Sequence, residues 1–181
     1  MVKSYSTLVC LFLLLCIPSH AQRTMKGQPF AGAAFLWGGA PSGEIRAGQY
    51  QSSFLWDAAL RASSFCKTLS TDDSLDCLDI TLAGSWQWRI LSDRSRIANL
   101  YAGAGVFAGY EVLDPLNRLP ETVDLGFKKG SIIYGVQPCV SMEVFFCRRV
   151  ALVISSSAPL TFNSPLGVFR WDVSAGIRLD L

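Results

Sequence analysis

The sequence predicts an all-β fold, an eight-stranded antiparallel up-and-down transmembrane β-barrel. The first observation is the stretch CLDITLAGSWQWRIL, residues 77–91, where apolar and polar residues alternate over fourteen positions. Period-2 alternation indicates a strand, and this one is longer than the usual 5 to 6 residues. The second is that charged residues make up 17% of the chain and the mean hydropathy is +0.31, whereas soluble domains are about 25% charged. The third observation is that the segments with alternating apolar and polar residues are even in number, as strands are in bacterial outer-membrane barrels.

The first 21 residues predict a cleaved signal peptide. Lys3 supplies a positive start, Leu8 to Ile17 form a ten-residue apolar core, and Ser19-His20-Ala21 provides small residues at the cleavage positions. We therefore divide the chain into a signal peptide, 1–21, and a β-barrel domain, 22–181. No later apolar run reaches the ~20 residues of a spanning helix. An exported apolar chain of this kind can pair all its backbone groups in a membrane only by closing a barrel.

Turn residues separate the mature chain into eight predicted strands. Their approximate ranges are Phe30 to Trp37, Ile45 to Ser52, Phe54 to Phe65, Leu78 to Leu91, Ile97 to Glu111, Ser131 to Phe146, Val150 to Ser157 and Val168 to Leu181.

The connectors between these strands alternate in length. Long connectors are predicted at 38–44, 66–77, 112–130 and 158–167, and short ones follow the second, fourth and sixth strands. Outer-membrane barrels have short periplasmic turns and longer exterior loops, which places all four long connectors outside the cell. Within the sixth strand, Pro138 has no amide hydrogen to donate to the ladder, so a bulge or local break is predicted there.

The charged face of each strand is predicted to point into the barrel. In the last strand, Arg170, Asp172 and Arg178 share one face, and an Arg facing lipid at the midplane costs about 2 to 4 kcal/mol. An eight-stranded barrel is only wide enough for side chains to fill it, so a packed ion-pair interior is favoured over a proton or ion path. The predicted lumen charge network consists of Asp57, Arg61, Asp79, Arg89, Glu111, Glu143, Arg170, Asp172 and Arg178.

The opposite face carries aromatic residues that are predicted to contact lipid. Residues of this kind near strand ends form the interfacial girdles of membrane barrels. The predicted set is Trp86, Trp88, Tyr110, Tyr134, Phe169 and Trp171.

No catalytic, cofactor-binding or metal-binding residues are predicted, and the chain is not expected to be an enzyme. Its single histidine, His20, belongs to the signal peptide, which removes the usual general base and the commonest metal ligand. A net charge of +2 without clustered Lys and Arg does not suggest direct nucleic-acid binding. Cys66 and Cys77 bracket a loop between adjacent strands and are a candidate disulfide, whose formation depends on strand register.

Several short strings resemble the conjugal transfer protein TraO family of conjugative transposons. They are Gln22-Arg23 followed by Gly27, RILSDRSR (89–96), LYAGAGVFAGYEVL (100–113), SIIYGVQPCVSMEVFF (131–146), RRVALVI (148–154) and the closing FRWDVSAGIRLDL (169–181). None of these strings is a catalytic signature. The resemblance implies a non-enzymatic component of the conjugation apparatus, placed in the outer membrane in contact with its lipid and working with other transfer proteins.

The leading hypothesis is a barrel that acts through loops and turns contacting partner proteins. The nineteen-residue connector from Val112 to Gly130 is the expected contact surface, because long loops on rigid scaffolds commonly carry function. Two alternatives stay open. One is a generic small outer-membrane barrel for adhesion or envelope integrity, and the other is a soluble lipocalin-like ligand-binding barrel, which has its faces inverted.

Overall fold

The computed structural model describes residues 26–38, 41–68, 74–94, 97–113, 130–164 and 169–181, with side chains described outside 65–68, 74–76 and 113. Within these residues no helix has the length and apolar character needed to cross a membrane. The strands are β1 (Pro29–Gly38), β2 (Ser42–Tyr50), β3 (Phe54–Thr68), β4 (Ser74–Ser92), β5 (Ala98–Leu113), β6 (Gly130–Phe145), β7 (Val150–Ser157), β8 (Leu160–Phe162) and β9 (Asp172–Asp180).

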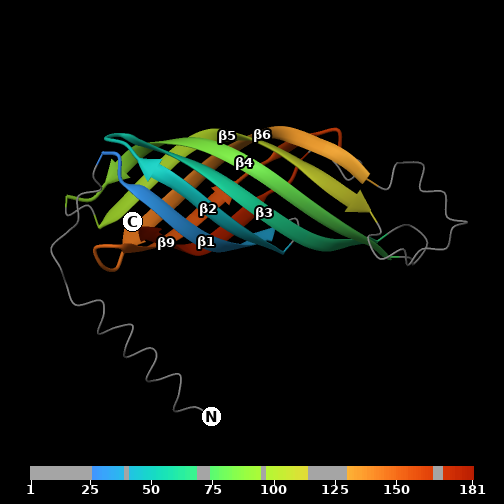
Figure 1. Cartoon of the computed structure of the whole chain (residues 1–181), viewed down its shortest axis with the longest axis horizontal. Coiled ribbons are helices and arrows are strands. Elements are labelled where there is room, and N and C mark those ends of the chain that lie inside the picture. The colour runs from blue at the N-terminus through green and yellow to red at the C-terminus, as the bar shows by residue number, and fades with distance from the viewer. Residues whose placement is uncertain (1–25, 39–40, 69–73, 95–96, 114–129, 165–168) are drawn as a thin grey trace, which may run out of the picture.

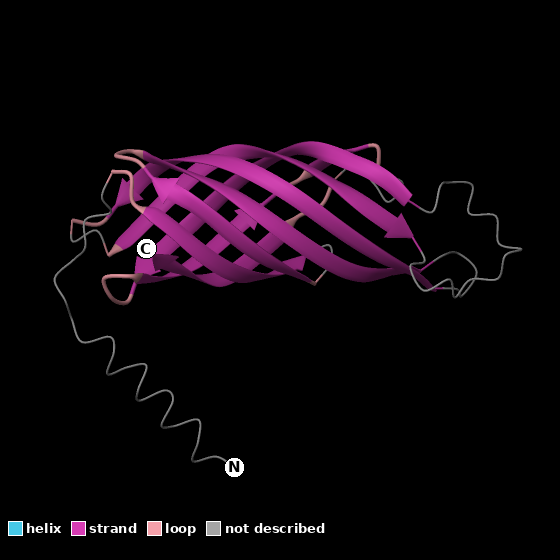
Figure 2. Cartoon of the chain, viewed as in Figure 1, coloured by secondary structure: helices cyan, strands magenta, loops and turns pink. Residues whose placement is uncertain are grey.

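These strands form one closed antiparallel barrel (Figures 1 and 2). The order runs β5-β4-β3-β2-β1-β9-β7-β6, and pairing between β5 and β6 closes the sheet. β7 and β8 both pair with β6, one after the other along its length, and together occupy a single position in the wall. The wall therefore has eight positions, which confirms the predicted eight-stranded antiparallel barrel.

β6 has no bulge at Pro138, because the ladder between β5 and β6 keeps its register through this residue, but the predicted local break occurs on the other side of β6, where Gln137 and Pro138 lie in neither ladder. This break separates the end of β7 from the start of β8. The carbonyl of Pro138 accepts a hydrogen bond from the Ala158 amide at 3.1 Å, but Pro138 has no amide hydrogen to return. The next residue, Pro159, also lacks this donor. Two missing donors at one place in the wall explain why regular pairing stops there.

Three of the predicted long connectors are shorter than expected. β1 and β2 leave only residues 39–41 between them, and β3 and β4 leave only 69–73, because both strand pairs extend further than the sequence predicted. The predicted connector 158–167 contains β8. Most of the predicted connector 112–130 lies outside the described residues.

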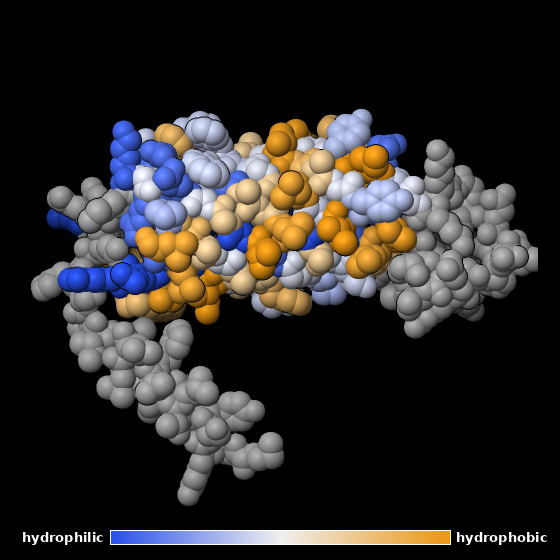
Figure 3. Space-filling view, viewed as in Figure 1, coloured by the Kyte–Doolittle hydropathy of each residue, from blue (hydrophilic) through white to orange (hydrophobic). Residues whose placement is uncertain are grey.

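The barrel has a polar interior and an apolar outer surface. Charged side chains such as Glu111 and Glu143 are fully buried, whereas large apolar side chains such as Leu82 are exposed. Figure 3 shows hydrophobic residues over the middle of the barrel and hydrophilic residues at the end where the chain terminates. A soluble ligand-binding barrel has the reverse arrangement, so this distribution argues against the lipocalin-like alternative.

The close approach of strands at Gly103 provides a test of interior packing. A Cβ atom at this position in β5 would overlap the Trp86 carbonyl and approach the Gln87 Cα. We expect Gly103→Ala to lower the free energy of unfolding by about 1 to 3 kcal/mol, because overpacking forces the backbone to shift. Urea unfolding of the barrel in lipid vesicles measures this. Gly43→Ala is the matched control, since its Cβ would meet nothing within 4 Å; equal losses for both variants would contradict the packing argument.

Candidate functional site

The described side chains of the barrel interior form three groups of ion pairs. The first group lies toward the rim with the long connectors. Arg170 Nη1 lies 3.0 Å from Asp79 Oδ2, and its Nη2 lies 3.0 Å from Glu111 Oε2. The hydroxyl of Ser164 also donates to Glu111 Oε2 at 3.1 Å. One guanidinium thereby connects the two carboxylates that β4 and β5 present to the interior.

The second group lies further along the barrel and joins β2, β3 and β9. Arg61 Nη1 lies 3.0 Å from Asp172 Oδ2, and its Nη2 lies 3.1 Å from Glu44 Oε2. Arg46 also pairs with Glu44, and its Nη1 lies 3.4 Å from Asp57 Oδ2. Two arginines and three carboxylates thus alternate in space, which gives each buried charge an opposite neighbour.

The third group is buried near the rim with the short turns. Arg178 forms an ion pair with Glu143, and its Nη1 donates to the Tyr50 hydroxyl at 3.2 Å. That hydroxyl is 3.1 Å from both carboxylate oxygens of Glu143 and donates to this carboxylate. The Arg178 guanidinium also lies 4.1 Å from the centroid of the Phe30 ring, a cation–π contact.

The structure brings eight of the nine predicted lumen residues into ion pairs, namely Asp57, Arg61, Asp79, Glu111, Glu143, Arg170, Asp172 and Arg178. Arg89 is different. It lies beside a register shift in β4, and its Nη2 donates to the Ser52 carbonyl at 2.6 Å in the turn between β2 and β3.

Glu44, Arg46 and Tyr50 also belong to this interior network, although the predicted set did not include them. All three lie on alternate positions of β2, so period-2 alternation contains the signal. The predicted strand began at Ile45, which left Glu44 in a connector. In the structure β2 begins at Ser42, and the added residues bring Glu44 opposite Arg61 in the ladder.

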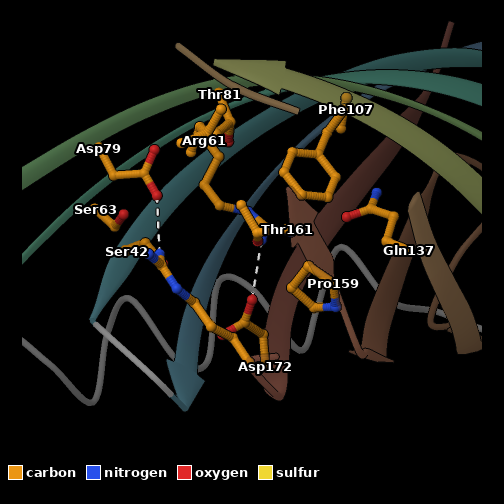
Figure 4. Close-up of a pocket in the computed structure, with 13 residues that line it drawn as sticks. Ser42, Arg61, Ser63, Asp79, Thr81, Phe107, Gln137, Pro159, Thr161 and Asp172 are labelled. Atoms are coloured by element: carbon orange, nitrogen blue, oxygen red, sulfur yellow. Dashed lines mark hydrogen bonds and ion pairs between the residues drawn. The ribbon is translucent and has the colours of Figure 1, made fainter. Parts of the chain in front are cut away.

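Little space remains between these side chains. Figure 4 shows one pocket between the first two groups, with Arg61, Asp79, Thr161 and Asp172 around it. This pocket has a volume of about 30 Å³, and a second pocket beside Asp57 has about 20 Å³. Each has room for one or two water molecules.

All six residues of the predicted aromatic lipid face point outward. Their exposed fractions range from 49% for Trp86 to 64% for Phe169. The Trp86 ring stacks on Phe54 at a centroid distance of 5.1 Å, and the Trp171 indole donates to the Ser156 hydroxyl at 2.7 Å. These contacts hold part of the aromatic surface in place.

The register offsets the two candidate disulfide cysteines by one residue. Cys77 lies opposite Phe65, and Cys66 lies opposite Asp76. Cys77 is buried, whereas the side chain of Cys66 lies outside the described residues. The disulfide stays a prediction, and this register does not make the two cysteines a directly facing pair.

The described interior has the chemistry of a packed ionic core. The carboxylates of the three groups are engaged with guanidinium groups, whereas the buried Asp180 carboxylate has no hydrogen-bond partner among the described residues. In the part of the chain with described side chains, no three His, Cys, Asp or Glu residues converge as metal ligands would. Such pairing holds strands together across the barrel.

Solved structures similar to this chain are small outer-membrane barrels. The outer membrane protein OprG from Pseudomonas aeruginosa aligns with a TM-score of 0.58 at 8% identity, over 90% of this chain and 99% of that one. The N-terminal β-barrel domain of Pseudomonas aeruginosa OprF aligns with a TM-score of 0.53 at 8% identity, over 86% and 98%. Ail, the attachment invasion locus protein of Yersinia pestis, aligns with a TM-score of 0.50 at 10% identity, over 86% and 100%. At such identities the likeness shows the fold alone.

A search of curated proteins finds no match. A family model does match, the one described as Conjugative transposon protein TraO, over residues 60–181. This range runs from the middle of β3 to the last residue and takes in about two thirds of the chain. The matched range includes five of the strings on which the resemblance rested, and it includes all three carboxylates paired to Arg170 and Arg178. Because the match extends over more than half of the chain, the chain belongs to the TraO family of conjugative transposon proteins.

Proposed function

We propose that this protein is a non-enzymatic outer-membrane component of a conjugative DNA transfer apparatus. Membership of the TraO family is the observation that carries the proposal. The barrel fold, its apolar outer surface and its ion-paired interior support a location in the outer membrane. On this proposal residues 1–21 direct export and are removed, and the six outward aromatic residues contact lipid.

The packed interior favours a scaffold over a conduit. Ion pairs cross the lumen at three levels, and the two pockets between them have space for only a few water molecules. DNA is far wider than such spaces, so the barrel does not itself carry the transferred strand. The protein acts on other conjugal transfer proteins, and direct nucleic-acid binding is not expected.

The connector between β5 and β6 is the proposed contact surface for these partners. The two strands pair along fifteen residue positions, up to Val112 opposite Gly130, which provides a rigid base for the connector. Loops on rigid barrel walls commonly carry binding functions. The short turns at the other rim are the second candidate for partner contacts.

Gene deletion and complementation in a donor strain test this proposal. We expect deletion to reduce transfer frequency and the full-length gene to restore it, with the protein found in outer-membrane fractions that resist salt extraction. A variant with residues 115–128 replaced by a short Gly-Ser linker should reach the membrane in normal amount and fail to restore transfer.

The outcomes separate the parts of the proposal. Normal transfer without the gene overturns the conjugation role and leaves the barrel intact. A defect in adhesion or in envelope integrity, without loss of transfer, would favour the generic-barrel alternative. Full restoration by the linker variant would move the partner contact to the short turns.

A further inference from the structure

A trough runs along the outer surface of β5. Its outward residues Ala102, Ala104 and Ala108 are small, and Val106 stands between the last two. The adjacent strands carry bulky residues. Trp86 lies opposite Ala104 on β4, and Tyr134 lies opposite Ala108 on β6. On the half of β5 toward the short turns, the small side chains of Ala102 and Ala104 lie beside Trp88 and Trp86 of β4, which leaves a groove in the wall.

The trough deepens into an open apolar hollow near the middle of the barrel. The hollow has a volume of about 630 Å³ and is lined mainly by Trp56, Trp86, Gly84, Ala104, Val106 and Val136. An extended hydrocarbon chain lying there contacts the alanine floor and an aromatic side wall together. Such a chain gains more dispersion contacts than one lying on a convex surface.

Exposed arginines lie at the short-turn end of this trough. Arg94 is in the turn before β5, and Arg148 and Arg149 are in the turn after β6. The turns are neighbours, because Phe145 donates its amide to the Ile97 carbonyl at 2.8 Å. Asp93 is the one exposed acidic residue among the described residues of these two turns, so the local charge is positive.

The distance between the arginines and the hollow fits one membrane leaflet. From Ala98, at the start of β5, to Ala104 is six residues, or ~20 Å along a strand at about 3.4 Å per residue. With the ~40° tilt of membrane barrel strands, this corresponds to ~15 Å along the membrane normal. Half of a ~30 Å hydrocarbon core is the same length.

We propose that the β5 trough and the arginines of the two adjoining turns bind one anionic glycerophospholipid of the periplasmic leaflet. The phosphate pairs with Arg94, Arg148 and Arg149, and one acyl chain lies along β5 with its end in the hollow. The positive charge selects an anionic headgroup, and the trough orders the chain. This site depends on the proposed membrane location but not on the role in conjugation.

Native mass spectrometry of the detergent-purified full chain, titrated with phosphatidylglycerol or phosphatidylcholine, tests the site. We expect one phosphatidylglycerol per protein to be retained, at least tenfold more tightly than phosphatidylcholine. Replacing all three arginines with glutamine should remove this tenfold preference. Lys26→Gln removes one exposed positive charge from the same rim and is the control that should keep the preference, because Lys26 lies beside β2 on the opposite side of the rim.

A second pair of variants tests the trough separately. Ala104→Phe fills the hollow and should weaken phosphatidylglycerol binding at least fivefold. Ala33→Phe, on the outer surface of β1 across the barrel, should have no effect. Circular dichroism confirms that each variant retains its barrel.

Three results would overturn the lipid site. They are equal retention of the two lipids, an unchanged preference in the triple arginine variant, and a protein dimer that excludes lipid and is broken by Ala104→Phe. The third would identify a second copy as the occupant of the trough. Failure of the deletion strain to show a transfer defect would leave the lipid result standing, so the two proposals fail separately.

Discussion

Arg178→Met should lower the free energy of unfolding by about 3 to 5 kcal/mol, one of the two largest effects expected for a single substitution in this protein. Arg178 and Glu143 have exposed fractions of 1% and 0%. Removing the guanidinium leaves the Glu143 carboxylate buried without its ion-pair partner, and uncompensated buried charges cost about this much. Urea unfolding in phospholipid vesicles, followed by tryptophan fluorescence, measures the change.

Two further variants separate the ion pair from simple loss of packing. The double variant Arg178→Met with Glu143→Met should recover much of the lost stability, because a buried pair replaced by apolar residues is often nearly neutral. Lys26→Met removes an exposed positive charge and should change stability by less than about 0.5 kcal/mol. If the double variant is as unstable as the sum of its two single variants, the stranded charge is not the cause.

Leu82→Arg should lower the free energy of unfolding by about 2 to 4 kcal/mol when the barrel is folded in a bilayer. Leu82 lies near the middle of β4, points outward and is 61% exposed. In a membrane this position faces hydrocarbon, where a charged side chain is poorly solvated near the midplane. The same urea titration measures the loss.

Leu91→Arg is the matched control for depth. Leu91 is equally apolar and 63% exposed, but it lies next to the turn that ends β4. Arginine near the interface costs about 0 to 1 kcal/mol, since its side chain can extend to water. Similar small costs at both positions would be the behaviour of a barrel surrounded by water and would contradict the membrane location.

Together these substitutions distinguish the two environments that the fold requires. The interior holds most of its charged side chains in ion pairs, and the exterior at mid-depth does not tolerate charge. The proposed function depends on this division, because a barrel with a closed ionic interior can hold its loops and turns rigidly at both membrane surfaces.

Much of the fold was predictable from local patterns. Alternation in residues 77–91 and in the last strand assigned Trp86 and Trp171 to the outer face and Asp172 and Arg178 to the inner one, as the structure has them. Alternation is a property of a single strand, so it can be read without knowing the neighbours. The cost of exposing arginine to lipid then decided which face is inside.

Pairing between strands was not predictable in this way. Arg61 reaches Asp172 across 111 positions of sequence, and Glu44 joined the network only because β2 begins earlier than the pattern indicated. The break predicted at Pro138 occurs on one side of β6 only, where a missing amide donor interrupts the pairing with β7 and β8 while the ladder with β5 continues.

The sequence alone therefore determined the strand class, the inward and outward faces and the family resemblance. The tertiary structure decided which charges meet, on which side of β6 the wall is interrupted and how Cys66 and Cys77 are staggered. The physical reason is that the face on which a side chain lies depends on its own strand, whereas its ion-pair partner depends on the register between strands. That register is settled only when all eight wall positions close into one ring.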